Sequence, residues 1–250
     1  MCLILVSNPT KGDFKFILAS NRDEFYKRKT SNMFWWSDID GLLAGQDLEQ
    51  KGTWLGISNK GKFAAVTNVR EFYKDEPNEK FLSRGDLVKD YFNFSGSPQN
   101  YVQNIQAEKY MGFNLIVSNF QNSSVFSSQG IEKFNSELIV IGNRALNTET
   151  EKLKSAEDDF KNIISKNFKH LDLISLMQSP KKNYQFDLKE INNNHGNEFN
   201  SRFITSDIYG TRSTTVITID RQNMVNVSEV IYDGFGENLE SNFFNFKIRS

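Results

Sequence analysis

The residue with the most chemistry available to it in this chain is Cys2, the only cysteine among 250 residues. Cytosolic aminopeptidase usually removes an initial methionine when the second residue is small, and cysteine qualifies. Cys2 would then carry a thiol and a free α-amine on one residue. Because such an amine has a reference pKa of about 7.7 to 8.0, far below that of lysine, part of it can accept a proton at neutral pH. The chain start therefore predicts a nucleophile that carries its own base.

A charged tetrapeptide, Asn21-Arg22-Asp23-Glu24, follows the apolar run that predicts the second strand. If the first two strands form an antiparallel hairpin, this tetrapeptide lies beside the chain start. We expect Asp23 to accept a hydrogen bond from the Cys2 ammonium or thiol, with Asn21 or Arg22 fixing the orientation. A neighbouring arginine or carboxylate would also shift the pKa values of the thiol and the amine.

Cys2 and the tetrapeptide also have simpler, structural interpretations, and so do the tryptophans and His170. A cysteine in a strand is a common small core residue, and charged residues at strand ends are usually only solvated. The tryptophans at 35, 36 and 54 favour core packing over a pocket wall. His170 is expected to end an amphipathic helix at the surface.

The first strands must position Cys2 and the tetrapeptide. Strands are expected at residues 2 to 7 and 14 to 19, joined by the turn-forming segment NPTKGD. Residues 22 to 50 lack clean periodicity, which predicts a long excursion before strands return near residues 54 to 58 and 63 to 69.

Helices are expected in the middle of the chain. Ser83 and Ser97 are typical N-cap residues and predict two short helices. Apolar residues at steps of three and four predict a long helix at 149 to 168, and a shorter one is expected at 171 to 178. The Asn-rich residues 181 to 200 are expected to form a surface loop that could act as a lid.

Strands return from Phe203 onward, and Gly210 with Thr211 is expected to form only a turn before the last of them. Because strands come first and last with helices between, the order argues against a parallel βαβ fold. The pattern predicts an α+β protein with two mostly antiparallel sheets and helices outside them. No repeat or linker interrupts the chain, so we expect one domain over residues 1 to 250.

Composition excludes several classes of partner. The chain has 30 Lys and Arg against 31 Asp and Glu, so its net charge of -1 gives no reason to bind nucleic acid. One cysteine allows neither an intramolecular disulfide nor a Cys-rich zinc site. The apolar residues 3 to 6 are too few for a signal peptide or an integral membrane segment. We therefore expect a cytoplasmic protein without a metal, and the sequence leaves its oligomeric state open.

Several motifs together carry a family resemblance. In order along the chain they read MCLIL, SNRDEF, GTWLGIS, AAVTNVR, SRGDLV, GFNLIV and YGTRSTTVI. Over most of its length the chain resembles the NRDE family, which includes transport and Golgi organisation protein 2. That family is similar to the N-terminal-nucleophile hydrolases, especially the choloylglycine hydrolase and penicillin V acylase group. The resemblance implies an N-terminal-nucleophile-hydrolase-like, four-layer αββα sandwich.

The resemblance also implies roles near the chain start. The enzyme group attacks an amide carbonyl with its freed cysteine, which matches Cys2. Its aspartate and the preceding asparagine match Asp23 and Asn21. Its arginine falls on Ser20 here, so Arg22 would have to substitute for it.

Further roles are implied later in the chain. The oxyanion donors of the group resemble a backbone amide near Ser58 or Asn59 and the side chain of Asn143. Such donors are worth roughly 3 to 4 kcal/mol each in acyl transfer. The group's late arginine resembles Arg202, whereas the NRDE signature points to Arg212.

Two functions of different classes remain, beside a purely structural scaffold. The first is a cofactor-independent amidohydrolase or acyltransferase that acts on a linear amide or acyl substrate through Cys2. The alternative is a non-catalytic carrier or chaperone for a hydrophobic small-molecule ligand, since the resembled family is associated with haem trafficking and with lipid or acyl-coenzyme A handling. Haem iron needs an axial ligand, for which His195 is the better of the two histidines.

Overall fold

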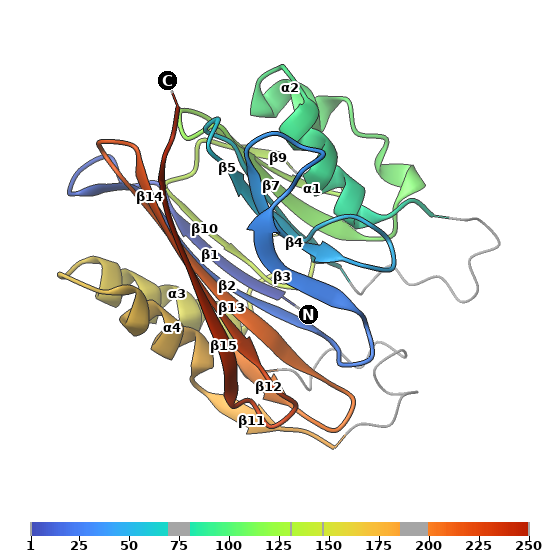
Figure 1. Cartoon of the computed structure of the whole chain (residues 1–250), viewed down its shortest axis with the longest axis vertical. Coiled ribbons are helices and arrows are strands. Elements are labelled where there is room, and N and C mark those ends of the chain that lie inside the picture. The colour runs from blue at the N-terminus through green and yellow to red at the C-terminus, as the bar shows by residue number, and fades with distance from the viewer. Residues whose placement is uncertain (1, 70–80, 131, 147, 186–199, 250) are drawn as a thin grey trace. The chain divides into compact units, whose positions relative to one another are not determined.

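The computed structural model describes residues 2–69, 81–130, 132–146, 148–185 and 200–249. They divide into two compact units, each built from several stretches of chain. Unit 1 comprises Met1–Arg28, Glu137–Gly142 and Asn147–Asn245, and unit 2 comprises Lys29–Ser136, Asn143–Leu146 and Phe246–Ser250. Each unit contains a sheet and helices (Figure 1). The predicted α+β class with mostly antiparallel sheets is therefore confirmed.

Unit 1 is organised around a six-stranded sheet. The strand order is β10-β1-β2-β13-β14-β15, and the β10-β1, β1-β2, β2-β13 and β13-β14 pairs are antiparallel. The first strands pair as predicted, because NPTKGD supplies the turn between them. The strands are β1 Cys2–Ser7, β2 Phe14–Phe25, β10 Leu138–Ile141, β13 Tyr209–Asp220, β14 Met224–Tyr232 and β15 Asn238–Lys247.

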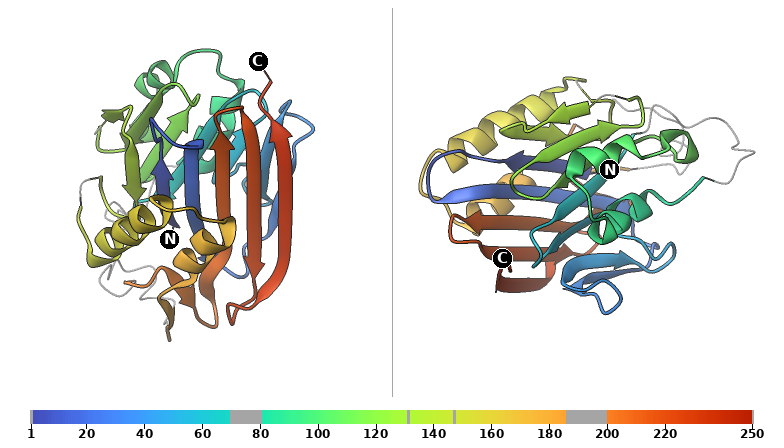
Figure 2. Two further views of the ribbon diagram at one scale, coloured as in Figure 1. Left: turned by 90° about the vertical axis from the view of Figure 1, so that its left-hand side faces the viewer. Right: turned by 90° about the horizontal axis from the view of Figure 1, so that it is seen from above.

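Two helices pack on one face of this sheet. Helix α3 (Glu151–Ile164) lies over β1 and β10, and helix α4 (His170–Gln178) lies over β2 and β13 (Figure 2). Successive strand residues alternate between the two faces of a sheet. The buried side chains that meet the helices accordingly include Leu3 and Leu5 of β1 and Ile17 and Ala19 of β2.

The long helix is shorter than the sequence predicted. Thr150 caps α3 by accepting a hydrogen bond from the backbone N–H of Leu153 at 3.2 Å, and the helix ends at Ile164. Phe168 continues the apolar spacing from the following loop, where its ring lies 5.4 Å from that of Phe14. The apolar period thus marked the buried face correctly but overstated the helix by one turn.

Unit 2 is organised around a seven-stranded antiparallel sheet in chain order, β3 to β9. The predicted caps are confirmed, because Ser83 accepts from Gly85 N and Ser97 accepts from Asn100 N. The elements are β3 Thr30–Trp35, β4 Leu42–Asp47, β5 Leu55–Ser58, β6 Phe63–Asn68, β7 Phe113–Ser118, β8 Ser123–Ser127, β9 Glu132–Phe134, helices α1 Arg84–Asn93 and α2 Pro98–Gln103, and the 3-10 turn Ala107–Lys109.

Residues 22–50 are not the irregular excursion that the sequence predicted. Strand β2 continues to Phe25, and β3 and β4 occupy much of the remainder. The expectation of a buried core role holds for Trp36, which is 5 % exposed, but is wrong for Trp35, which is 41 % exposed and packs on Phe246. Irregular alternation of charged and aromatic residues hid these strands, since one of them carries a register shift between Ser31 and Phe34.

Two further expectations are corrected within unit 1. Lys181–Asn183 forms β11, which pairs in parallel with β12 (Phe203–Thr205), where a loop was expected. Gly210 lies inside β13, not in a turn. A Cβ on Gly210 would come within 2.1 Å of Tyr26 Oη, so this close approach requires glycine.

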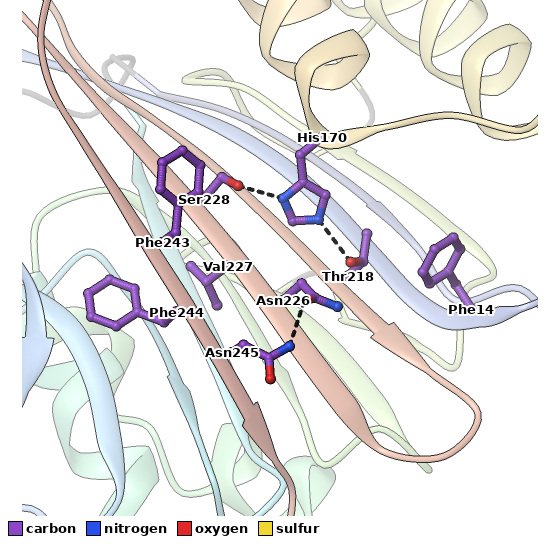
Figure 3. A pocket seen from close by; sticks show the side chains of 9 residues that line it. All are labelled: Phe14, His170, Thr218, Asn226, Val227, Ser228, Phe243, Phe244 and Asn245. Atoms are coloured by element: carbon purple, nitrogen blue, oxygen red, sulfur yellow. Dashed lines mark hydrogen bonds between the residues drawn. The ribbon is translucent and has the colours of Figure 1, made fainter.

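His170 begins α4, whereas the sequence predicted that it ends a helix at the surface. Its Nδ1 lies 2.7 Å from Ser228 Oγ and its Nε2 lies 2.9 Å from Thr218 Oγ1 (Figure 3). The ring forms part of the wall of a hollow of about 380 Å³, where Asn245 Nδ2 donates to Asn226 Oδ1 at 2.7 Å. Because both ring nitrogens bond to hydroxyl groups of the sheet, we interpret His170 as a structural residue that holds the start of α4 against β13 and β14.

The hydrogen-bonded position of His170 predicts that it contributes to stability in a way that is lost in acid. Burial lowers the pKa of His170, so the folded protein takes up its proton less readily than the unfolded chain does. The contribution is full above the ordinary histidine value of about 6.5 and is lost as pH falls below it. We expect the melting temperature to fall between pH 7.5 and pH 5.5 by more in the wild type than in His170→Asn. Equal slopes for the two proteins in thermal unfolding would show that folding does not lower the pKa of His170.

Candidate functional site

Cys2 is the first described residue of β1, and its Cα lies directly opposite that of Arg22 on β2. Directly opposite residues of an antiparallel pair share one face of the sheet. Since Leu3 faces α3 and α4, alternation places Cys2 and Arg22 on the other face. Cys2 is partly exposed there. The hairpin therefore brings the cysteine and the tetrapeptide together, as predicted.

The surroundings of Cys2 keep its thiol protonated. Burial, the largest effect, raises the pKa of the thiol, and the negative charge of Asp23 raises it as well. The charge of the amino terminus, the charge of Arg22 and a hydrogen bond with the Asp23 backbone act in the opposite direction, and the net pKa is raised. A thiol in this state needs a base before it can attack a carbonyl.

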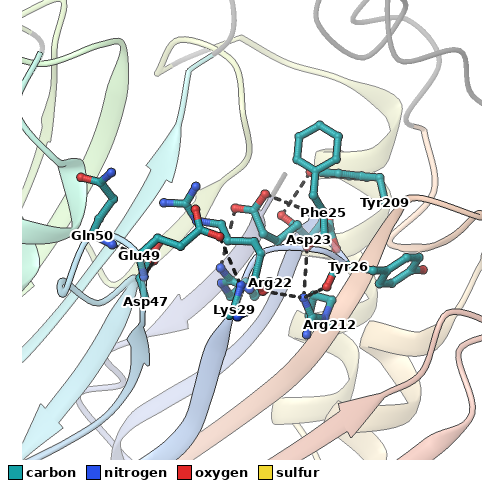
Figure 4. Close-up of polar contacts among 12 residues, drawn as sticks. Arg22, Asp23, Phe25, Tyr26, Lys29, Asp47, Glu49, Gln50, Tyr209 and Arg212 are labelled. Atoms are coloured by element: carbon teal, nitrogen blue, oxygen red, sulfur yellow. Dashed lines mark hydrogen bonds and ion pairs between the residues drawn. The ribbon is translucent and has the colours of Figure 1, made fainter. Parts of the chain in front are cut away.

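Asp23 is a buried residue inside β2, not a residue beyond the strand end. Its Oδ1 accepts a hydrogen bond from Thr211 Oγ1 at 2.7 Å. Its backbone carbonyl accepts one from Tyr209 Oη at 3.1 Å (Figure 4). A backbone hydrogen bond links Asp23 to the Cys2 thiol. A bond from the Cys2 amine to the Asp23 carboxylate stays a prediction.

Asn21 has a structural environment. Its Nδ2 donates to the backbone carbonyls of Met177 and Arg202, both at 2.8 Å, and its Oδ1 accepts from Thr214 Oγ1 at 2.6 Å. Asn21 is fully buried and shares the helix-facing side of β2 with Ala19. The side chain therefore ties β2 to α4 and β13. This geometry does not support the predicted role of orienting Cys2 by direct contact.

Arg22 shares the face of Cys2 and contacts a partner that the sequence did not single out. Its Nη2 lies 3.7 Å from Glu24 Oε2, and the Arg22 side chain is 7 % exposed. Two residues apart on a strand, the pair lies on one face beside the thiol. Arg22 can therefore act on Cys2 as a charge without lying in the position of the enzyme group's arginine.

Arg212 is the extra residue of a bulge in β13, since Thr211 pairs with Asp23 and Ser213 with Arg22. Its Nη1 donates to three backbone carbonyls at the end of β2, at 3.1 to 3.4 Å (Figure 4). Burial lowers the pKa of its guanidinium, and the carboxylate of Glu24 opposes this effect. Arg212 therefore fixes the chain that follows the tetrapeptide.

Arg202 points to the helices. Its Nη2 lies 2.5 Å from Asp159 Oδ2 and 2.6 Å from Ser155 Oγ of α3, and its Nη1 donates to the Leu176 carbonyl of α4 at 3.3 Å. Of the two late arginines, Arg212 is thus the one that lies on the strand beside the tetrapeptide. The contacts of Arg202 explain it as a tie between the loop before β12 and both helices.

The predicted oxyanion donors lie in unit 2. The backbone N–H of Ser58 donates to the Lys62 carbonyl at 2.8 Å, and that of Asn59 donates to the Gly41 carbonyl at 3.0 Å. Both N–H groups are therefore already bonded within the protein, and the geometry does not support either as an oxyanion donor. Asn143 is 8 % exposed and its Nδ2 donates to the Asn68 carbonyl at 2.8 Å. The role of the Asn143 side chain as an oxyanion donor stays a prediction.

Sequence reasoning missed Thr211, Tyr209 and Glu24. The signal for Thr211 was present, because Thr211 and Thr214 are spaced to meet Asp23 and Asn21 across an antiparallel pair with one bulged residue. Recognising it required knowing which strand pairs with β2. His195, the expected haem ligand, lies outside the described residues.

The described ranges contain neither a candidate metal cluster nor a candidate membrane-spanning helix. No group of three or more His, Cys, Asp and Glu side chains there is arranged to hold a metal ion. No helix in the same ranges is long and apolar enough to cross a membrane.

Solved structures of N-terminal-nucleophile acylases share the fold of this chain. Penicillin V acylase from Agrobacterium tumefaciens matches with a TM-score of 0.51 and 13% sequence identity, over 99% of this chain and 86% of that one. A mutant of conjugated bile acid hydrolase from Clostridium perfringens matches with a TM-score of 0.54 and 10% identity, over 98% and 92%. The chain is therefore a protein of the N-terminal-nucleophile-hydrolase fold class, as predicted.

The family follows from sequence. The family model "Transport and Golgi organisation 2" matches residues 1–234, and the chain belongs to this family. The bovine Transport and Golgi organization protein 2 homolog is 37% identical over 127 residues, which is 47% of this chain and 45% of the relative. The Drosophila melanogaster Transport and Golgi organization protein 2 is 28% identical over 97% of this chain and 96% of its own length. The alignment with the mammalian relative thus spans less than half of it.

Proposed function

We propose that this protein is a cysteine N-terminal-nucleophile amidohydrolase or acyltransferase acting on a linear amide or acyl substrate in the cytoplasm. The observation that carries the proposal is the placement of Cys2, which lies opposite Arg22 and whose thiol accepts a hydrogen bond from the Asp23 backbone N–H. The fold supports it, but a fold alone does not establish activity.

The proposed reaction begins after Met1 is removed. The Cys2 thiol passes its proton to the α-amine, and the sulfur forms a bond to the substrate carbonyl carbon. The positive charge of Arg22, on β2, lies near this sulfur and favours its thiolate form. The resulting oxyanion collapses, the C–N bond breaks, and the amine leaves with the proton held by the α-amine. Water, or another acyl acceptor, then cleaves the thioester and regenerates the thiol.

The base is needed because the pKa of the thiol is raised by burial. A protonated thiol attacks poorly, whereas the amine of a processed Cys2 has the pKa of a base near neutrality. In this reaction Cys2 therefore supplies both the nucleophile, its thiol, and the base, its α-amine.

The proposal is tested by following amine release from a panel of linear amides. Penicillin V and a conjugated bile acid belong in the panel, because they are the compounds named for the structural neighbours. We expect catalytic release from at least one amide by the wild type. A protein that releases no amine but binds haem or an acyl ligand stoichiometrically would instead be a carrier.

Asn143 provides a prediction that depends on the family resemblance. If its carboxamide donates to the oxyanion, Asn143→Ala lowers kcat by about 10² to 10³ with little change in KM. Steady-state kinetics on the best amide measure this effect. Asn100→Ala removes an exposed asparagine of the same unit and serves as the matched control. A loss of similar size in both variants, or in neither, excludes Asn143 from the reaction.

A further inference from the structure

The bulge in β13 gives Thr211 an unusual position. Thr211 pairs with Asp23 and Ser213 pairs with Arg22, so Arg212 is left over between them. A bulge of this kind re-aims the side chains around it and recurs beside functional sites. Here Thr211, which is 1 % exposed, directs its hydroxyl to the side chain of Asp23.

The direction of the hydrogen bonds around Thr211 is determined by chemistry. The backbone N–H of Ile204 donates to Thr211 Oγ1 at 3.0 Å, and a backbone N–H can only donate. The single hydroxyl proton of Thr211 is therefore directed to Asp23 Oδ1, 2.7 Å away. That carboxyl oxygen acts as an acceptor, and the bond fixes the position of the Asp23 side chain.

The same segment of β13 also holds the backbone of Asp23. Tyr209 Oη donates to the Asp23 carbonyl at 3.1 Å, and Tyr209 itself is held because its backbone N–H donates to Ser206 Oγ at 3.0 Å. The side chain and the backbone carbonyl of Asp23 are thus both held by β13, which pairs with β2 on the edge opposite β1. The backbone of Asp23 is also the group that bonds to the Cys2 thiol.

We propose that Thr211 is a positioning residue that holds Asp23 in place beside the Cys2 thiol, and thereby sets the reactivity of that thiol. Its importance for turnover rests on the proposed amidohydrolase function, but its effect on the thiol does not. Thr211 donates its hydroxyl hydrogen to Asp23, so its effect on the sulfur is exerted through Asp23.

The test is a titration of the thiol itself. Cys2 is the only cysteine, so thiolate absorbance near 240 nm reports on it once the spectrum of Cys2→Ala is subtracted. In Thr211→Val the Asp23 carboxylate loses its donor, so Asp23 is held less firmly beside the sulfur. Its backbone hydrogen bond to the thiol, which lowers the pKa of the thiol, is then weakened. We expect the midpoint to move up by as much as about one pH unit. Thr211→Ser keeps the hydroxyl and should restore the wild-type midpoint.

Thr215→Val is the matched control, because Thr215 lies on the same strand but pairs with Ser20. Circular dichroism and thermal unfolding identify any variant that fails to fold, and Thr211→Ser then compares the hydroxyl with the control in a folded protein. A wild-type midpoint in folded Thr211→Val, or an equal shift in Thr215→Val, overturns the proposal. The titration needs no turnover, so a chain that hydrolyses no amide can still confirm or refute the role of Thr211.

Discussion

Cys2→Ala is expected to abolish amide turnover by this protein. In the proposed reaction the Cys2 sulfur forms the bond to the substrate carbonyl, and no other cysteine can replace it. Loss of the nucleophile in a hydrolase of this kind costs about 10³-fold or more in kcat. Amine release from the best substrate, measured beside the wild type, gives this ratio directly.

The control for this variant must keep the α-amine. Alanine and serine are small, so Met1 removal should proceed in both Cys2→Ala and Cys2→Ser, as intact mass can verify. Cys2→Ser keeps a hydroxyl in place of the thiol and should retain at most a few per cent of activity, since a hydroxyl is the weaker nucleophile. Turnover in Cys2→Ala within about tenfold of the wild type would remove Cys2 from the mechanism.

Asn21→Ala is expected to destabilise the fold strongly. The asparagine is fully buried and makes three side-chain hydrogen bonds, two to backbone carbonyls and one to Thr214. Truncation leaves these buried groups unsatisfied, which costs about 3 kcal/mol in the free energy of unfolding. For a chain of this size that corresponds to a melting temperature lower by about 6 to 12 °C.

Asn245→Ala is the matched control, because Asn245 is exposed and bonds to the side chain of Asn226. It should change the melting temperature by little. Thermal unfolding followed by circular dichroism measures both variants. If Asn21→Ala melts like the wild type but loses activity, the residue orients Cys2 as the sequence first suggested and the structural interpretation is wrong.

The sequence predicted the chain start well, because local rules determine it. A turn joins two apolar runs, so the β1-β2 hairpin and the placement of the tetrapeptide beside Cys2 follow from short-range pattern. The N-caps Ser83 and Ser97 were predictable for the same reason. Contacts between residues that are close in sequence can therefore be predicted from local sequence patterns.

The extent of β2 was not predictable from the same pattern. Polar residues after an apolar run normally mark a strand end, yet Asn21 and Asp23 are buried because Thr214 and Thr211 of β13 satisfy them. These partners lie nearly two hundred residues away in sequence, and the bulge in β13 shifts their register. No local signal reveals such a pairing, so the sequence identified the tetrapeptide but missed what holds it.

His170 shows the same limit in a different form. Its position next to apolar residues indicated a helix end, but its two hydroxyl partners, Ser228 and Thr218, come from β14 and β13. The direction of the pKa shift could not be inferred without the burial that those strands provide. Histidine roles depend on neighbours more than on sequence position.

The most direct test of Cys2 as an N-terminal nucleophile compares the chain with a free Cys2 amine against a chain in which that amine stays blocked by a retained N-terminal extension. Both proteins are mixed with the best amide, quenched in acid, and examined by mass spectrometry of the N-terminal peptide. We expect a thioester on Cys2, and turnover, only in the chain with the free amine. Equal turnover by the blocked chain, or an acyl group on any other residue, would contradict this role of Cys2.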